Sequence, residues 1–156
     1  MRNILAIFLI AAGLSSCTND KAVEKAIVVN VEADEQEEKG QSQELTLNNG
    51  NKWKIDRSTH NNVVNLQNIL NAFTEDGSRP LSDYQEVQLD LKNGIDKMIK
   101  ECHMTGPDHE VLHHWLKPLI NKVADLKKAN TVADASRSLK NIRAQVKLNA
   151  QYFEYN

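Results

Sequence analysis

Four residues around position 106 carry side chains that bind soft or borderline metal ions: Cys102, Met104, His109 and His113. A cysteine thiolate, a methionine thioether and imidazole nitrogens suit copper(I), and cysteine with several histidines also suits zinc. His109 and His113 are four residues apart, which places them on one face of a helix at a spacing that can hold a single ion. We therefore predict a copper or zinc site formed by these four residues, with His60 as an outer candidate.

The same side chains also have plain structural explanations. Histidines near a helix start often cap or pack, and Met104 could close one end of a core. If Cys17 is chemically modified, Cys102 has no intramolecular partner, so it is a buried small residue, a ligand or half of an intermolecular disulfide. Cys102 and His109 could also pair as nucleophile and base, but the spacing supplies no third residue to orient them.

The elements that must position these residues are predicted to be four helices, because four segments carry apolar residues at helical spacing. They cover about 58–74, a stretch from the N-cap Ser82 to Cys102, a stretch that follows Gly106-Pro107-Asp108, and a stretch from the N-cap Thr131 to Phe153. Asp108 is expected to complete a capping box, and Gly94 to permit a close helix contact. Because the connections are short, we predict a mainly α protein, an antiparallel up-down-up-down four-helix bundle.

A short β-hairpin is predicted ahead of the bundle. Residues 45–55 alternate apolar and polar on both sides of Asn49-Gly50, and both turn residues tolerate a positive φ. The apolar side of this hairpin, formed by Leu45, Leu47, Trp53 and Ile55, is expected to lie against the helices.

This topology brings one end of each helix to a shared pole of the bundle. All five histidines fall at that pole: His60, His103, His109, His113 and His114. The apolar stripes, extended to the pole, predict that His60, Cys102 and His109 point inward. Aromatic residues at the same pole form either a lid over it or an exposed recognition patch: Trp53, Trp115, Tyr152, Phe153 and Tyr155.

The first residues of the chain predict export and lipid anchoring. Arg2 is followed by an apolar run, Ile4 to Leu14, that is too short to span a bilayer as a mature helix. Leu14-Ser15-Ser16-Cys17 has the form of a lipobox, so residues 1–16 are predicted to be removed and Cys17 to be acylated. Acyl chains hold a protein at the membrane without a basic patch.

Composition divides the rest of the chain into a tether, residues 17–43, and one domain, residues 44–156. The tether ends in an acidic, aromatic-free stretch, and an apolar segment, residues 26–31, interrupts it. Lys and Arg are interspersed with Asp and Glu, so nucleic acid is not an expected partner. Thr18, where enterobacterial inner-membrane lipoproteins carry Asp, favours the outer membrane.

Sequence motifs give no support for an enzyme. The chain lacks Gly-x-Ser-x-Gly, His-Glu-x-x-His, a glycine-rich phosphate loop and the Glu-x-x-His repeat of di-iron bundles. Cys-x-x-Cys-His is also absent, which excludes c-type haem attachment.

Residues 102–116 resemble a pattern in small, uncharacterised lipoproteins of Bacteroidota-type bacteria, C-x-M-x-G-x-x-H-x-x-L-H-x-W-L, which follows a segment similar to residues 47–53. The resemblance implies that Cys102, Met104, His109, His113 and Trp115 are kept while His103 and His114 vary. It brings no assigned activity. Two functions follow from the sequence: an envelope module that binds copper or zinc, and a non-enzymatic envelope interaction protein without metal.

Overall fold

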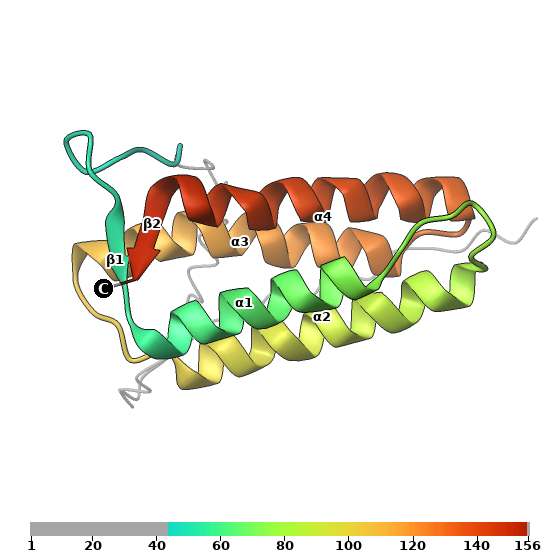
Figure 1. Cartoon of the computed structure of the whole chain (residues 1–156), viewed down its shortest axis with the longest axis horizontal. Coiled ribbons are helices and arrows are strands. Elements are labelled where there is room, and N and C mark those ends of the chain that lie inside the picture. The colour runs from blue at the N-terminus through green and yellow to red at the C-terminus, as the bar shows by residue number, and fades with distance from the viewer. Residues whose placement is uncertain (1–43, 156) are drawn as a thin grey trace, which may run out of the picture. The chain divides into compact units, whose positions relative to one another are not determined.

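The computed structural model describes residues 44–155. Its helices lie side by side (Figure 1). The elements are β1, Trp53–Ile55; α1, Arg57–Ala72; α2, Leu81–Glu101; α3, Pro107–Lys127; α4, Val132–Tyr152; and β2, Phe153–Tyr155. The predicted mainly α architecture with four helices is confirmed. The predicted signal peptide, the acylated Cys17 and the tether with its apolar segment lie outside the described residues.

Two helices begin at side-chain caps. Asp56 caps α1, because its carboxylate accepts a hydrogen bond from the Thr59 backbone N–H at 2.7 Å. Thr131 caps α4 as predicted, and its hydroxyl oxygen accepts from the Asp134 N–H at 3.1 Å. The sequence therefore defines these two starts to within a residue.

The other two helices begin at prolines, and two capping predictions are wrong there. α2 begins at Leu81 directly after Pro80, so Ser82 lies inside the helix. α3 begins at Pro107, where a missing N–H has no cost because first-turn donors lack helical partners. Asp108 does not cap α3. Its carboxylate accepts the Lys54 backbone N–H at 3.1 Å and so joins α3 to β1.

The apolar stripes of the four helices meet in one core. At the start of α1, the Ser58 hydroxyl donates to the carbonyl of Glu101, the last residue of α2, at 2.8 Å. At the end of α1, the Phe73 ring packs edge to face with Tyr84 in the first turn of α2, with ring centroids 4.9 Å apart. α1 and α2 therefore run in opposite directions. The fully enclosed large side chains include Leu66, Leu91, Met98, Leu112, Trp115, Leu119, Leu126, Leu139 and Ile142.

Gly94 marks the close approach of α2 to α1, as predicted. A Cβ atom at this position would lie 2.8 Å from Leu66 Cδ2 and 3.3 Å from Asn65 Nδ2. The two helices can pack at this distance because glycine has no Cβ atom.

The predicted hairpin is reduced to its turn. Asn49 and Gly50 both have positive φ, 50° and 87°, but only Asn48 and Asn51 pair across the turn. The strand after the turn pairs instead in parallel with the C-terminal strand, Trp53 opposite Phe153 and Ile55 opposite Tyr155. Figure 1 shows the two strands side by side at one end of the helices.

The parallel pairing is favoured because both strands place an apolar side chain in the core. Ile55 and Phe153 are buried, whereas Leu47, expected on the buried side of the hairpin, is 42% exposed. The segment before the turn is held to β1 by a side chain, since Trp53 Nε1–H donates to the Thr46 carbonyl at 2.6 Å. Phe153, predicted to continue the last helix, is the C-cap of α4 and the first residue of β2.

No helix within residues 44–155 is both long and apolar enough to cross a lipid bilayer.

Candidate functional site

The two predicted sulfur ligands lie beside one buried hydroxyl group. Thr59 is fully buried in the first turn of α1, and its Oγ1 lies 3.5 Å from Met104 Sδ and 4.0 Å from Cys102 Sγ. Cys102 is the C-cap of α2 and Met104 follows in the connection to α3. The α1 residue that meets the sulfur atoms is therefore Thr59.

The prediction that His60 points toward this cluster is wrong. Its ring stacks on Tyr155, with 4.9 Å between ring centroids and 18° between planes. One residue along a helix turns a side chain by roughly 100°, so His60 points in a different direction from the buried Thr59. The ring of His60 instead covers the end of β2.

The two predicted imidazole ligands lie together on the first turns of α3. The rings of His109 and His113 pack edge to face with centroids 4.4 Å apart. Burial lowers the pKa of His113, and the neighbouring His109 lowers it further. Both effects favour the neutral imidazole, which is the form that binds metal ions.

Within residues 44–155, no three His, Cys, Asp or Glu side chains are grouped in a way that could hold a metal ion. The structure thus shows two pairs, Cys102 with Met104 and His109 with His113. The other two histidines differ in exposure, since His103 is exposed and His114 is half-buried.

Acidification is expected to weaken the fold through His113. Its pKa in the folded chain lies below the ordinary value of 6.5, so the unfolded chain binds the proton more readily. The contribution of this group to stability is therefore fully present above pH 6.5 and is lost as the pH falls toward the folded-state pKa. Urea unfolding at pH 7 and pH 5 should show a smaller loss of stability for His113→Gln than for the unchanged chain. The exposed His103→Gln is the control and should lose as much stability as the unchanged chain. If His113→Gln also lost that much between pH 7 and pH 5, the role of His113 would be ruled out.

Aromatic residues at the same pole close the core. The Trp115 side chain is fully buried, packs edge to face with Phe153, and its indole N–H donates to the Gln145 carbonyl at 2.8 Å. The Gln145 side-chain amide in turn donates to the Trp115 carbonyl at 2.9 Å. Trp115 and Phe153 therefore form part of the lid, while Tyr155 is 38% exposed.

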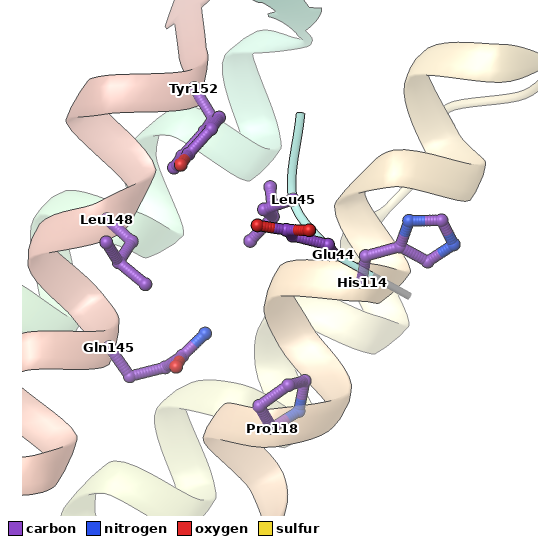
Figure 2. Close-up of a pocket in the computed structure, with 7 residues that line it drawn as sticks. All are labelled: Glu44, Leu45, His114, Pro118, Gln145, Leu148 and Tyr152. Atoms are coloured by element: carbon purple, nitrogen blue, oxygen red, sulfur yellow. The ribbon is translucent and has the colours of Figure 1, made fainter. Parts of the chain in front are cut away.

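A groove between α3 and α4 lies next to this reciprocal pair (Figure 2). Its volume is about 480 Å³, within the usual range of roughly 300–1,000 Å³ for small-molecule sites. The lining residues come from three segments: Glu44 and Leu45, His114 and Pro118 of α3, and Gln145, Leu148 and Tyr152 of α4. Figure 2 shows Glu44 and Leu45 lying between the two helices.

Pro118 gives this groove an unusual backbone feature. α3 continues through Pro118, which has no backbone N–H, so the carbonyl of His114 lacks its helical donor. The side-chain amide nitrogen of Gln145 donates to the Trp115 carbonyl, and the side-chain amide oxygen of Gln145 remains as an acceptor. The groove thus combines apolar surface from Leu148 and Tyr152 with hydrogen-bond acceptors.

This groove was not predicted from the sequence. Leu148 and Tyr152 are four residues apart on α4, as His114 and Pro118 are on α3, and this spacing places each pair on one face. That signal was available, but the contribution of Leu45 depends on where the segment before the turn packs. Comparisons with protein-family models, curated proteins and solved structures gave no match to this chain.

Proposed function

We propose that this chain is a lipid-anchored, non-enzymatic interaction protein of the cell envelope that binds an extended polypeptide segment in the α3–α4 groove. Leu14-Ser15-Ser16-Cys17 supports the anchor, and Thr18 supports the outer membrane as the address. The contacts of Ser58 with Glu101 and of Trp115 with Phe153 support an up-down-up-down order of the helices.

The observation that carries this proposal is the position of Leu45. The chain between Glu44 and Leu47 has no regular secondary structure, and Leu45 packs against the core from within the groove. The groove therefore already accommodates one extended segment, and about 480 Å³ beside it is open. A second segment would find apolar surface on Leu148 and acceptors at the His114 carbonyl and Gln145.

Selection from a random peptide library displayed on phage tests this function. The bait is the chain from residue 17 onward with Cys17→Ser, which keeps the protein in solution without its lipid. We expect enriched peptides that lose binding to Leu148→Arg and keep it for Leu89→Arg, a matched change at an exposed α2 position. Failure to enrich any Leu148-dependent peptide would reject the groove as a peptide site.

A second candidate function, binding of copper or zinc, is favoured by one specific observation. Cys102 and Met104 meet at Thr59, while His109 and His113 pair on α3, so each half of the predicted ligand set is preassembled. The α2–α3 connection would have to move to bring the two halves onto one ion, because no three candidate ligands of residues 44–155 are grouped as they stand.

Metal content tests the second candidate function. If the second candidate holds, the chain reconstituted with copper(I) or zinc should retain about one equivalent, and the double variant Cys102→Ser with His109→Ala should lose it. Retention of less than about a tenth of an equivalent by the unchanged chain would reject metal binding. Loss of folding in the double variant, without any metal effect, would mark the pole as structural.

A further inference from the structure

A basic stripe runs along α4. Arg137, Lys140, Arg143 and Lys147 follow one another at intervals of three or four residues, which places them along one side of the helix. Asp134 is the only acidic residue of α4, and α1, which packs beside it, contains no acidic residue. Arg137 pairs with Asp134, so the excess positive charge of this side of α4 comes from the remaining cations of the stripe.

A groove lies between this stripe and α1. It has a volume of about 330 Å³ and is lined by Gln67, Leu70 and Asn71 of α1 and by Arg143, Val146 and Lys147 of α4. Gln67 and Asn71 form an i,i+4 pair of amides, and Arg143 and Lys147 form an i,i+4 pair of cations. Leu70 and Val146 add apolar lining. The groove thus offers amides along one wall and positive charge along the other.

The cations of the groove differ in how firmly they are held. The Arg143 guanidinium donates to the Phe73 carbonyl at 2.7 Å, and its Nε lies 4.0 Å from a carboxylate oxygen of Glu75. These contacts fix Arg143 at one end of the groove. Lys140 and Lys147 are exposed and form no ion pair with any of residues 44–155, so their charge is not neutralised by this part of the protein.

From this charge pattern we infer that the α1–α4 groove binds an extended acidic polypeptide segment of a partner protein. Carboxylates of the segment pair with Lys147 and Arg143 in the groove and with Lys140, which lies about one turn of α4 before Arg143. The Gln67 and Asn71 amides hydrogen-bond its backbone, because an amide supplies both a donor and an acceptor. A membrane surface would be attracted by the cations alone and would have no use for the wall of amides.

The site is separate from the proposed α3–α4 groove, since the two grooves flank α4 on different sides and share no lining residue. Loss of binding in one groove therefore does not count against binding in the other. Binding of an acidic segment here is expected to be unaffected by Leu148→Arg.

Fluorescence anisotropy with a labelled hexaglutamate peptide tests the inference. The protein is the chain from residue 17 with Cys17→Ser, at low ionic strength. We expect binding that weakens about tenfold or more for Lys147→Glu, because a favourable charge pair becomes repulsive. Lys117→Glu, the same charge change at an exposed position of α3, should alter binding by no more than about twofold.

A second pair of variants tests the wall of amides. Gln67→Ala with Asn71→Ala should weaken hexaglutamate binding and leave binding of dextran sulfate, an anionic polymer without a peptide backbone, unchanged. No hexaglutamate binding, or equal binding to the Lys147→Glu and Lys117→Glu variants, would overturn the inference. Lys147-dependent sedimentation with phosphatidylglycerol vesicles in the absence of peptide binding would overturn it in favour of a membrane contact.

Discussion

Replacing Trp115 with alanine is expected to lower the free energy of unfolding by about 3–5 kcal/mol. The indole is fully buried and packs against Phe153, so its removal leaves a large cavity at one end of the core. The variant also loses the hydrogen bond from the indole N–H to Gln145. Since a domain is stable by only about 5–15 kcal/mol, this one change removes a large share of the total.

Urea unfolding followed by circular dichroism measures this loss. Trp115→Phe keeps a buried ring but loses the indole N–H, so we expect it to fall between the unchanged chain and the alanine variant. Leu89→Ala, at a side chain that is 54% exposed on α2, is the matched control for truncation and should change stability little. A Trp115→Ala variant as stable as Leu89→Ala would contradict the described core.

Gly94→Ala is expected to destabilise the domain by about 1–3 kcal/mol, although alanine is the better helix former by about 1 kcal/mol. The added Cβ would lie 2.8 Å from Leu66 Cδ2, and the Leu66 side chain is completely enclosed. The clash therefore cannot be relieved by turning Leu66 into solvent. α1 and α2 would have to move apart, which would loosen the core on both sides.

The neighbouring residue supplies the control for this prediction. Asn93 is exposed on the same helix, so Asn93→Ala should be neutral or raise stability by a few tenths of a kcal/mol. Thermal unfolding of the two variants side by side separates helix propensity from packing. If Gly94→Ala raised the melting temperature as much as Asn93→Ala, the close contact between the helices would be refuted.

Local sequence signals predicted the helices well because each helix carries its own apolar stripe and because the start of α4 has its own side-chain cap. That cap is Thr131, and its partner Asp134 is three residues away. The pairing of the strands depends on a different kind of information. Trp53 pairs with Phe153, and no local pattern reports a contact between segments so far apart along the chain.

The candidate site was predicted less completely. Cys102 with Met104 and His109 with His113 lie near helix ends, as expected, but the α1 side chain beside the two sulfur atoms is Thr59 and not His60. The two positions differ by one residue, and a step of one residue along a helix turns the side chain by roughly 100°. The basic stripe from Arg137 to Lys147 could have been found from spacing alone. Its amide-lined neighbour could not, because that depends on which helix packs beside α4.

Site-specific photo-crosslinking in intact cells shows whether the α3–α4 groove holds a partner protein. A photoreactive amino acid is placed in turn at Leu148 and Tyr152 in the groove, and at Leu89 and Ile99 as exposed positions of α2. We expect a discrete adduct from the two groove positions, in the membrane fraction, and we expect it to disappear with Cys17→Ser. Adducts of equal yield from the α2 positions, or none from the groove, would contradict it.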